Sequence, residues 1–129
     1  MIHPLFRKKI LLVEANIDSE ALTKSLLETQ FANELQICSA SAIQESIYFL
    51  RSSRIDFVVS GFVFSDGNGI EIYNYICETK QSIKLIFYTG HLVFEFPTQE
   101  KFFYGFLHKP DMQSLIDFIA QVWLVESAR

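Results

Sequence analysis

The segment Ile55-Asp56-Phe57-Val58-Val59-Ser60 has the clearest strand pattern in this sequence, because β-branched and aromatic residues dominate it. Residues 10–13 form a near-continuous apolar run upstream, and residues 83–88 form a similar run downstream. Such runs are typical of strands that are covered on both faces of a sheet. We therefore expect the three segments to be strands of one buried sheet.

Weaker signals complete the pattern. Residues 35–38 and 104–108 predict two further strands, and helices are predicted over residues 18–30, over 42–51, from Ile70 onward, and from just after Pro110 to about residue 125. We expect Asp18 to cap the first helix, because Asp is a preferred N-cap residue. The expected apolar face of that helix consists of Ala21, Leu22, Ser25, Leu26 and Thr29.

Five strands that alternate with helices predict an α/β fold. Parallel strands need right-handed crossovers, which place helices on both faces of the sheet. No repeat, low-complexity tract or linker divides the 129 residues. We expect residues 9–126 to form one domain, preceded by a short lead-in at residues 1–8.

Composition excludes several classes of protein. The chain is 50% hydrophobic and 15% aromatic, which is too apolar for a disordered protein, and no apolar run approaches the length of a membrane span. The N-terminus places its charges after its apolar residues, unlike a secretory signal, so we expect a cytoplasmic protein without membrane contact. A net charge of −4 argues against nucleic-acid binding. Cys38 and Cys77 have no further ligands at short spacing, so we expect buried free thiols and no metal site.

In a sheet of this kind the functional crevice lies at the carboxyl ends of the strands. We therefore consider the residues that directly follow each predicted strand as candidates for the site. These are Glu14, Ala15 and Asn16, then Gly61 and Phe62, then Thr89 and Gly90, and finally Lys109.

The ordered set of these landmarks resembles the receiver domain of two-component response regulators. Residues 9–14 look like its first strand, residues 55–60 its third, residues 85–90 its fourth with a terminal hydroxyl, and residues 106–110 its fifth with the Lys-Pro pair. The resemblance covers about residues 9–125. It implies a flavodoxin-like or CheY-like (βα)5 three-layer sandwich with five helices and a five-stranded parallel sheet in the order 2-1-3-4-5.

The resemblance also shows which catalytic groups are missing. An active receiver binds Mg²⁺ through two acids and an aspartate, and that aspartate takes up a phosphoryl group. Here Glu14 is the first acid, but Ala15 stands at the second position and Gly61 at the phospho-acceptor position. Glycine offers no nucleophile and one carboxylate is a poor Mg²⁺ site, so we expect no phosphorylation at Gly61, lost or weak Mg²⁺ binding, and no enzymatic activity.

Thr89 and Lys109 remain from the machinery of the family, and each leaves two interpretations open. Lys109 either binds an anion together with Thr89 or forms an ion pair with Glu14, and we favour the ion pair. Asp66 is a weak candidate for a substitute phospho-acceptor, against a simple Asx turn with Gly67. Ser60 should point away from the crevice, because side chains alternate along a strand.

The resemblance places a conformational switch at Thr89 and Phe106, although Phe106 can equally be ordinary packing. Pro97 is incompatible with a helix interior, so we expect at most a short helix over residues 98–103. The aromatic residues of this region are a candidate protein interface, with packing against the core as the alternative. They are Phe94, Phe96, Phe102 and Phe103.

Together these expectations describe a pseudo-receiver of two-component or phosphorelay signalling that acts by phosphorylation-independent binding of a protein partner or of a second copy of itself. Because the chain ends soon after the last predicted helix, we expect any output to pass through such contacts. The alternative is a sensor that binds a small anion or other ligand in the vacated crevice at Gly61, Thr89 and Lys109. A small flavodoxin-like enzyme is a third hypothesis, but no nucleophile and base pair can be assembled from the crevice residues.

Overall fold

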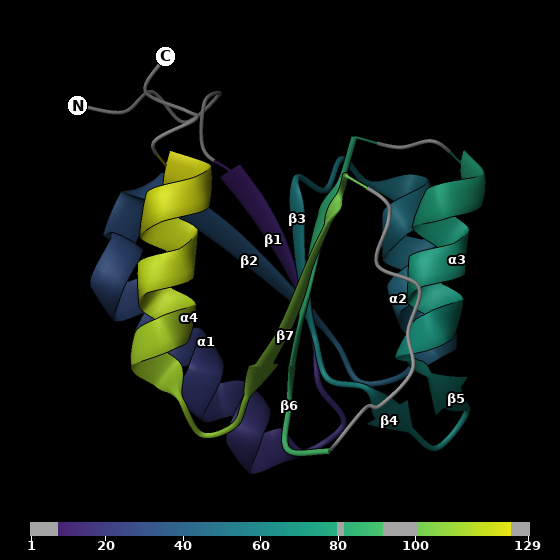
Figure 1. The fold of residues 1–129 in the computed structure, drawn as a ribbon, viewed down its shortest axis with the longest axis horizontal. Coiled ribbons are helices and arrows are strands. Elements are labelled where there is room, and N and C mark those ends of the chain that lie inside the picture. The colour runs from purple at the N-terminus through teal and green to yellow at the C-terminus, as the bar shows by residue number, and fades with distance from the viewer. Residues whose placement is uncertain (1–7, 80–81, 92–100, 125–129) are drawn as a thin grey trace.

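A computed structural model describes residues 8–79, 82–91 and 101–124, and its centre is a five-stranded parallel sheet (Figure 1). The strands are β1 (Lys8–Val13), β2 (Leu35–Ala40), β3 (Phe57–Ser60), β6 (Lys84–Thr89) and β7 (Phe103–His108). Their order in space is β2-β1-β3-β6-β7. This confirms the predicted order 2-1-3-4-5.

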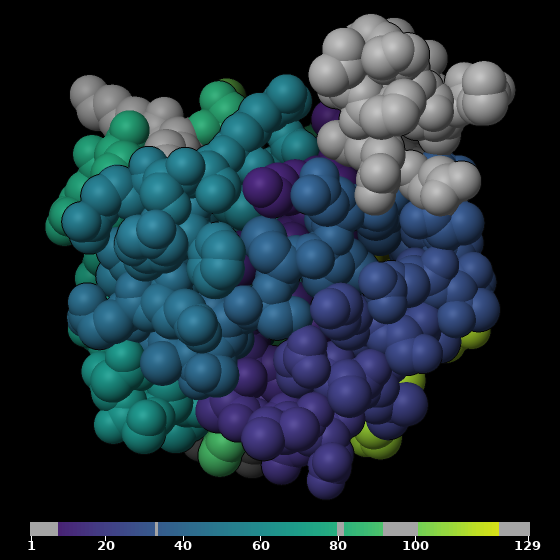
Figure 2. All heavy atoms as spheres, turned by 180° about the vertical axis from the view of Figure 1, so that it is seen from behind, coloured from purple at the N-terminus to yellow at the C-terminus, as the bar shows by residue number. Residues whose placement is uncertain are grey.

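Helices cover both faces of the sheet and make a three-layer sandwich (Figure 1). One face is covered by α1 (Ile17–Phe31) and α4 (Met112–Phe118), and the π-helical turns of η3 (Ile119–Leu124) continue α4. The other face is covered by α2 (Ile43–Ser52) and α3 (Gly69–Thr79). A short 3₁₀ turn, η2 (Ala32–Glu34), leads from α1 into β2. Each face of the sheet has its own apolar core. Seen from behind, α1, the edge strand β2 and α2 lie next to one another (Figure 2).

The register of the strands brings their carboxyl ends to one edge of the sheet. Val13 pairs with Ala40 on one side and with Ser60 on the other, and Thr89 pairs with His108. The interiors of β1, β3 and β6 are almost fully buried, as the apolar runs predict. The residues that follow each strand are therefore neighbours, which is the arrangement that the candidate site requires.

A small hairpin between β3 and α3 was not predicted. Its strands, β4 (Val63–Phe64) and β5 (Gly67–Asn68), form a separate antiparallel ladder in which Val63 pairs with Asn68. Two residues per strand are too few to give a periodic signal in the sequence.

The predicted cap and buried face of α1 are both wrong. Asn16 is extended and caps the helix by accepting a hydrogen bond from the Ser19 amide at 2.9 Å, so Asp18 lies in the first turn. The buried residues are Thr23, Leu27 and Phe31. The helix carries two apolar stripes one residue apart, and the stripe that ends in the large ring of Phe31 faces the sheet, which leaves Leu22 58% exposed.

The short helix predicted over residues 98–103 is wrong for residues 101–103, the part of it that the structure describes. Residues 98–100 lie outside the described residues, as does Pro97. Lys101 and Phe102 form a turn, and Phe103 begins β7 beside Leu85. The backbone of the Phe102 turn is held by a hydrogen bond from the Leu85 amide to its carbonyl at 2.9 Å, so β-pairing replaces the helix here.

The helices and cysteines of the described residues bear on three further expectations. The structure describes four α-helices where the resemblance implies five, and residues 92–100 are not described. None of the described helices combines the length and apolar character of a bilayer-spanning segment. Within the described residues neither Cys38 nor Cys77 forms a disulfide bond, and both are half-buried rather than buried as expected.

Candidate functional site at the carboxyl ends of the strands

Hydrogen bonds that continue the sheet fix the first residue of each loop at this edge. The Glu14 amide donates to the Ala40 carbonyl at 2.9 Å, and the Gly61 amide donates to the Val13 carbonyl at 2.8 Å. The Lys109 amide donates to the carbonyl of Thr89 at 3.0 Å. These residues line an open cleft of about 440 Å³. Its full lining is Glu14, Asn16, Ser19, Gly61, Phe62, Val63, Thr89, Gly90, His91 and Lys109.

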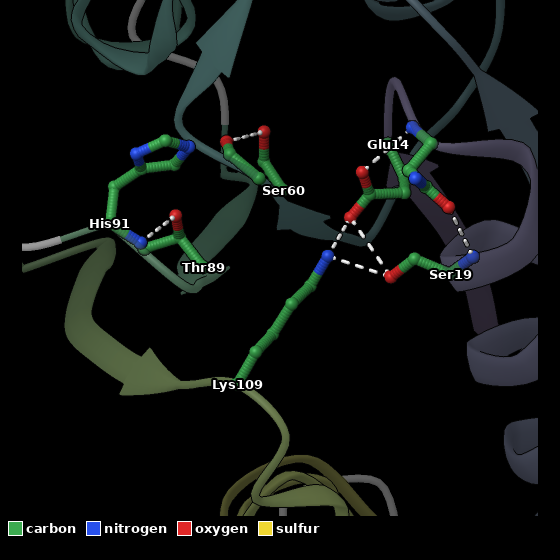
Figure 3. A network of polar contacts seen from close by, with 8 residues as sticks. Glu14, Ser19, Ser60, Thr89, His91 and Lys109 are labelled. Atoms are coloured by element: carbon green, nitrogen blue, oxygen red, sulfur yellow. Dashed lines mark hydrogen bonds and ion pairs between the residues drawn. The ribbon is translucent and has the colours of Figure 1, made fainter.

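Lys109 forms an ion pair with Glu14 across the cleft (Figure 3). Its Nζ also donates to the Ser19 hydroxyl at 2.7 Å, and the Asn16 amide donates to Glu14 Oε2 at 3.0 Å. The Lys109 ammonium lies 5.7 Å from the centre of the Tyr88 ring, within the range of a cation-π contact. The two charges are largely shielded, because the side chains are only 23% and 12% exposed. The structure thus has the ion pair that the sequence favours over an anion site.

Gly61, where the resemblance places the phospho-acceptor, carries no reactive group. Gly61 has no side chain, although a Cβ there would make ordinary contacts with the Phe64 ring at 3.6 Å and with Glu14 Oε1 at 3.7 Å. Ser60, directly before it, is fully buried, and its hydroxyl donates to the Gly61 carbonyl at 2.7 Å. The position therefore has space for a side chain but no nucleophile.

The described residues do not fit a Mg²⁺ site of the receiver type. Mg²⁺ prefers several oxygen ligands in octahedral geometry. Among the described residues that line the cleft, Glu14 is the single carboxylate, and it is engaged with Lys109. Ala15 and Gly61 add no side-chain oxygen. Nowhere in residues 8–79, 82–91 and 101–124 do three His, Cys, Asp or Glu residues gather as metal ligands.

Asp66 does not belong to the cleft. It lies at the tip of the β4–β5 hairpin, where its carboxylate accepts hydrogen bonds from the Ile43 amide at 2.9 Å and the Gln44 amide at 3.0 Å. The hydrogen bond from Gln44, followed by that from Ile43, holds the pKa of Asp66 below its ordinary value. Instead of the expected Asx turn with Gly67, Asp66 caps α2, whose own N-cap residue, Ala42, has no capping side chain.

Thr89 and Phe106, the two predicted switch residues, lie in different surroundings. Thr89 is buried, and its hydroxyl accepts a hydrogen bond from the His91 amide at 3.1 Å. The Phe106 ring is partly buried and stacks on Phe87, with 5.1 Å between the ring centres and 24° between the planes. Both residues are packed inside the protein, and their role as a switch remains a prediction.

The predicted aromatic interface is wrong for Phe103, which is buried in the core beneath α3 because it begins β7. Phe102 is partly buried and contacts the ring of Tyr73, with 5.2 Å between the centres. Phe94 and Phe96 lie outside the described residues.

Sequence reasoning missed the contacts of Ser19 in the cleft and the capping role of Asp66. Ser19 contacts both members of the ion pair, and Asp66 caps a helix that begins 23 residues before it. Ser19 lies three residues after the true cap, Asn16, and the incorrect choice of Asp18 as the cap hid that position. No local sequence pattern predicts the contact between Asp66 and the start of α2.

The structural comparisons agree on one fold. The CheY-like response-regulator receiver domain from Methanospirillum hungatei JF-1 superposes with a TM-score of 0.78 at 20% identity, over 95% of this chain and 97% of that chain. The signal receiver domain of an HD domain-containing protein from Pseudomonas fluorescens Pf-5 has a TM-score of 0.72 at 21% identity, over 95% and 99% of the two chains. The chain has the fold of a receiver domain.

A third receiver domain, from a putative Luxo repressor protein of Vibrio parahaemolyticus, gives a TM-score of 0.78 at 19% identity, over 95% of this chain and 93% of that chain. No family model and no curated protein sequence matches the chain. The receiver fold is therefore visible in the structure at sequence identities too low to carry a function, so the function must be argued from the site.

Proposed function

We propose that this chain is a phosphorylation-independent receiver-like module that signals by binding a protein partner in a two-component or phosphorelay pathway. One observation carries the proposal: Lys109 is paired with Glu14 and Ser19 beside a phospho-acceptor position that is glycine. The crevice that would be controlled by a phosphoryl group is instead neutralised by the protein's own side chains.

The chemistry of phosphoryl transfer supports this proposal. Transfer to a receiver needs a nucleophile and cationic groups that stabilise the charge on the phosphoryl oxygens. Gly61 supplies no nucleophile, and the Lys109 ammonium has its charge compensated by Glu14. A crevice of this kind has one charge state, so the surface around it does not depend on a kinase.

Restoring the missing groups tests the proposal. The wild type, Gly61→Asp and the double variant Ala15→Asp/Gly61→Asp are incubated with acetyl phosphate and Mg²⁺, and their intact masses are measured. Because a Cβ fits at Gly61, we expect both variants to fold and the double variant to gain a phosphoryl group while the wild type gains none. A phosphoryl adduct on the wild type would contradict the proposal. If the double variant folds but does not react, the residues at positions 15 and 61 are not what prevents phosphorylation of the wild type.

Light scattering on the same samples tests the binding part. The oligomeric state of the wild type should be the same with and without acetyl phosphate, because its crevice does not change charge. A change of oligomeric state in the wild type on adding acetyl phosphate would contradict a phosphorylation-independent module.

A further inference from the structure

The loop that follows the phospho-acceptor position, residues 61–68, is attached at its base to the β6–β7 side of the sheet. Phe62 lies next to Gly61, and its ring contacts Phe87 edge to face, with 5.2 Å between the centres. The same ring contacts Phe106 at 5.9 Å, and Phe106 in turn stacks on Phe87. Ring pairs at these separations attract one another beyond their buried area. The first side chain of the loop is thus part of the packing that holds Phe106.

The tip of the same loop is attached to a different helix. Both carboxylate oxygens of Asp66 accept hydrogen bonds, one from the Ile43 amide and one from the Gln44 amide. These amides belong to the first turn of α2, where backbone donors have no partner within the helix. The loop supplies the cap that Ala42 cannot provide.

Between base and tip the loop is closed by its own hydrogen bonds and by tight packing. The Gly69 amide donates to the Phe62 carbonyl at 2.7 Å, and Val63 pairs with Asn68 across the hairpin. A Cβ at Gly69 would lie 2.4 Å from the Phe87 ring and 2.8 Å from the Phe62 ring. The base of the loop is therefore packed tightly against these two rings.

We propose that residues 61–68 form a fixed strap that couples the packing of Phe106 to the N-terminus of α2, in place of control by phosphorylation. This inference rests on the proposed function, because it explains how a crevice without an acceptor keeps its surroundings in one arrangement. Cores and hydrogen-bonded loops have discrete arrangements rather than a continuum, so a strap fixed at both ends links two distant elements.

Hydrogen exchange of backbone amides in the full chain tests the coupling from both ends. Asp66→Asn removes the charge of the cap and replaces one of its two acceptor oxygens with an NH2 group that cannot accept a hydrogen bond. We therefore expect the Ile43 or the Gln44 amide, whichever loses its acceptor, to exchange about fivefold faster, the usual effect of losing one hydrogen bond. If the strap couples the two elements, the β7 amides around Phe106 also exchange faster, by more than about twofold. Phe62→Leu, which removes the ring at the base, should reciprocally accelerate exchange at Ile43 and Gln44.

Two matched variants serve as controls. Asp117→Asn removes an exposed carboxylate that accepts a hydrogen bond from Gln113 within α4, and Phe102→Leu removes a ring that packs on Tyr73 outside the strap. Both should change exchange only near the substitution. If Asp66→Asn affects only α2 and Phe62→Leu affects only the β6–β7 side, the strap does not couple them. Because the two variants act from opposite ends, either one decides the question if the other does not fold. A phosphoryl adduct on the wild type would defeat the proposed function without altering this exchange map.

Discussion

The ion pair between Lys109 and Glu14 should contribute measurably to stability, and the size of its contribution follows from its surroundings. Among the described residues, Lys109→Met leaves the Glu14 carboxylate with the Ser19 hydroxyl and the Asn16 amide as its hydrogen-bond partners, in a site where its side chain is 12% exposed. Removing one partner of a buried pair costs about 3–5 kcal/mol, and an exposed pair contributes about 0–1 kcal/mol. For this partly buried pair we expect the free energy of unfolding to fall by about 1–3 kcal/mol. In a domain of this size each kcal/mol corresponds to a Tm shift of about 4 °C.

A double-mutant cycle separates the pair from the effect of each substitution. Urea unfolding of Lys109→Met, Glu14→Gln and the double variant should give a coupling energy of about 1–2 kcal/mol. The matched control is Arg54→Met, which breaks the pair with Asp56 at 3.3 Å; the Arg54 side chain is 79% exposed, so the loss should stay below about 1 kcal/mol. A coupling energy below about 0.3 kcal/mol between Lys109 and Glu14 would show that the ion pair does not stabilise the fold.

Three further predictions concern the Asp66 cap, the packing around Gly69 and the Tyr88 hydroxyl. Because hydrogen bonds from α2 amides hold the pKa of Asp66 below its ordinary 3.8, its charge contributes stability that is present above that value and is lost as the pH falls through the lower, folded-state pKa. The urea midpoint of Asp66→Asn should therefore lie below that of the wild type at pH 7 and approach it in strong acid. A difference between the two midpoints that does not change with pH would show that the charge of Asp66 does not stabilise α2. Gly69→Ala should lower the unfolding free energy by about 1–3 kcal/mol through its clash with Phe87, whereas Gly90→Ala, with open space around it, should be nearly neutral in the same assay. Tyr88→Phe removes a buried hydroxyl that has no hydrogen-bond partner in the described residues, so its Tm should be unchanged or higher, and a clear loss would show that the hydroxyl is satisfied.

The fold could be predicted because its three inner strands, β1, β3 and β6, are buried on both faces. Runs such as residues 55–60 and 83–88 are apolar for that reason, and their alternation with helices leaves few topologies. The buried face of α1 could not be predicted, because Leu22 and Leu27 lie on adjacent stripes and only contact with the sheet selects one of them.

The site was predicted in part, for a similar physical reason. Glu14 and Lys109 follow parallel strands, and opposite charges at one edge of a sheet favour a pair, so their contact could be anticipated. The contacts of Ser19 could not be anticipated, because they depend on the residue at which α1 begins. Asp66 depends on a hairpin of two-residue strands that carries it to α2, 23 residues away in the chain. Contacts made only in the folded chain leave no local pattern in the sequence.

We propose that a chain with this receiver fold signals without accepting a phosphoryl group. The intact mass of the wild-type chain is measured after incubation with acetyl phosphate and Mg²⁺, before and after acid quenching. Because Gly61 has no nucleophile and Lys109 is paired with Glu14, we expect an unchanged mass. A stoichiometric phosphoryl adduct would show that another residue has taken over the role of the missing aspartate, and that phosphorylation does occur.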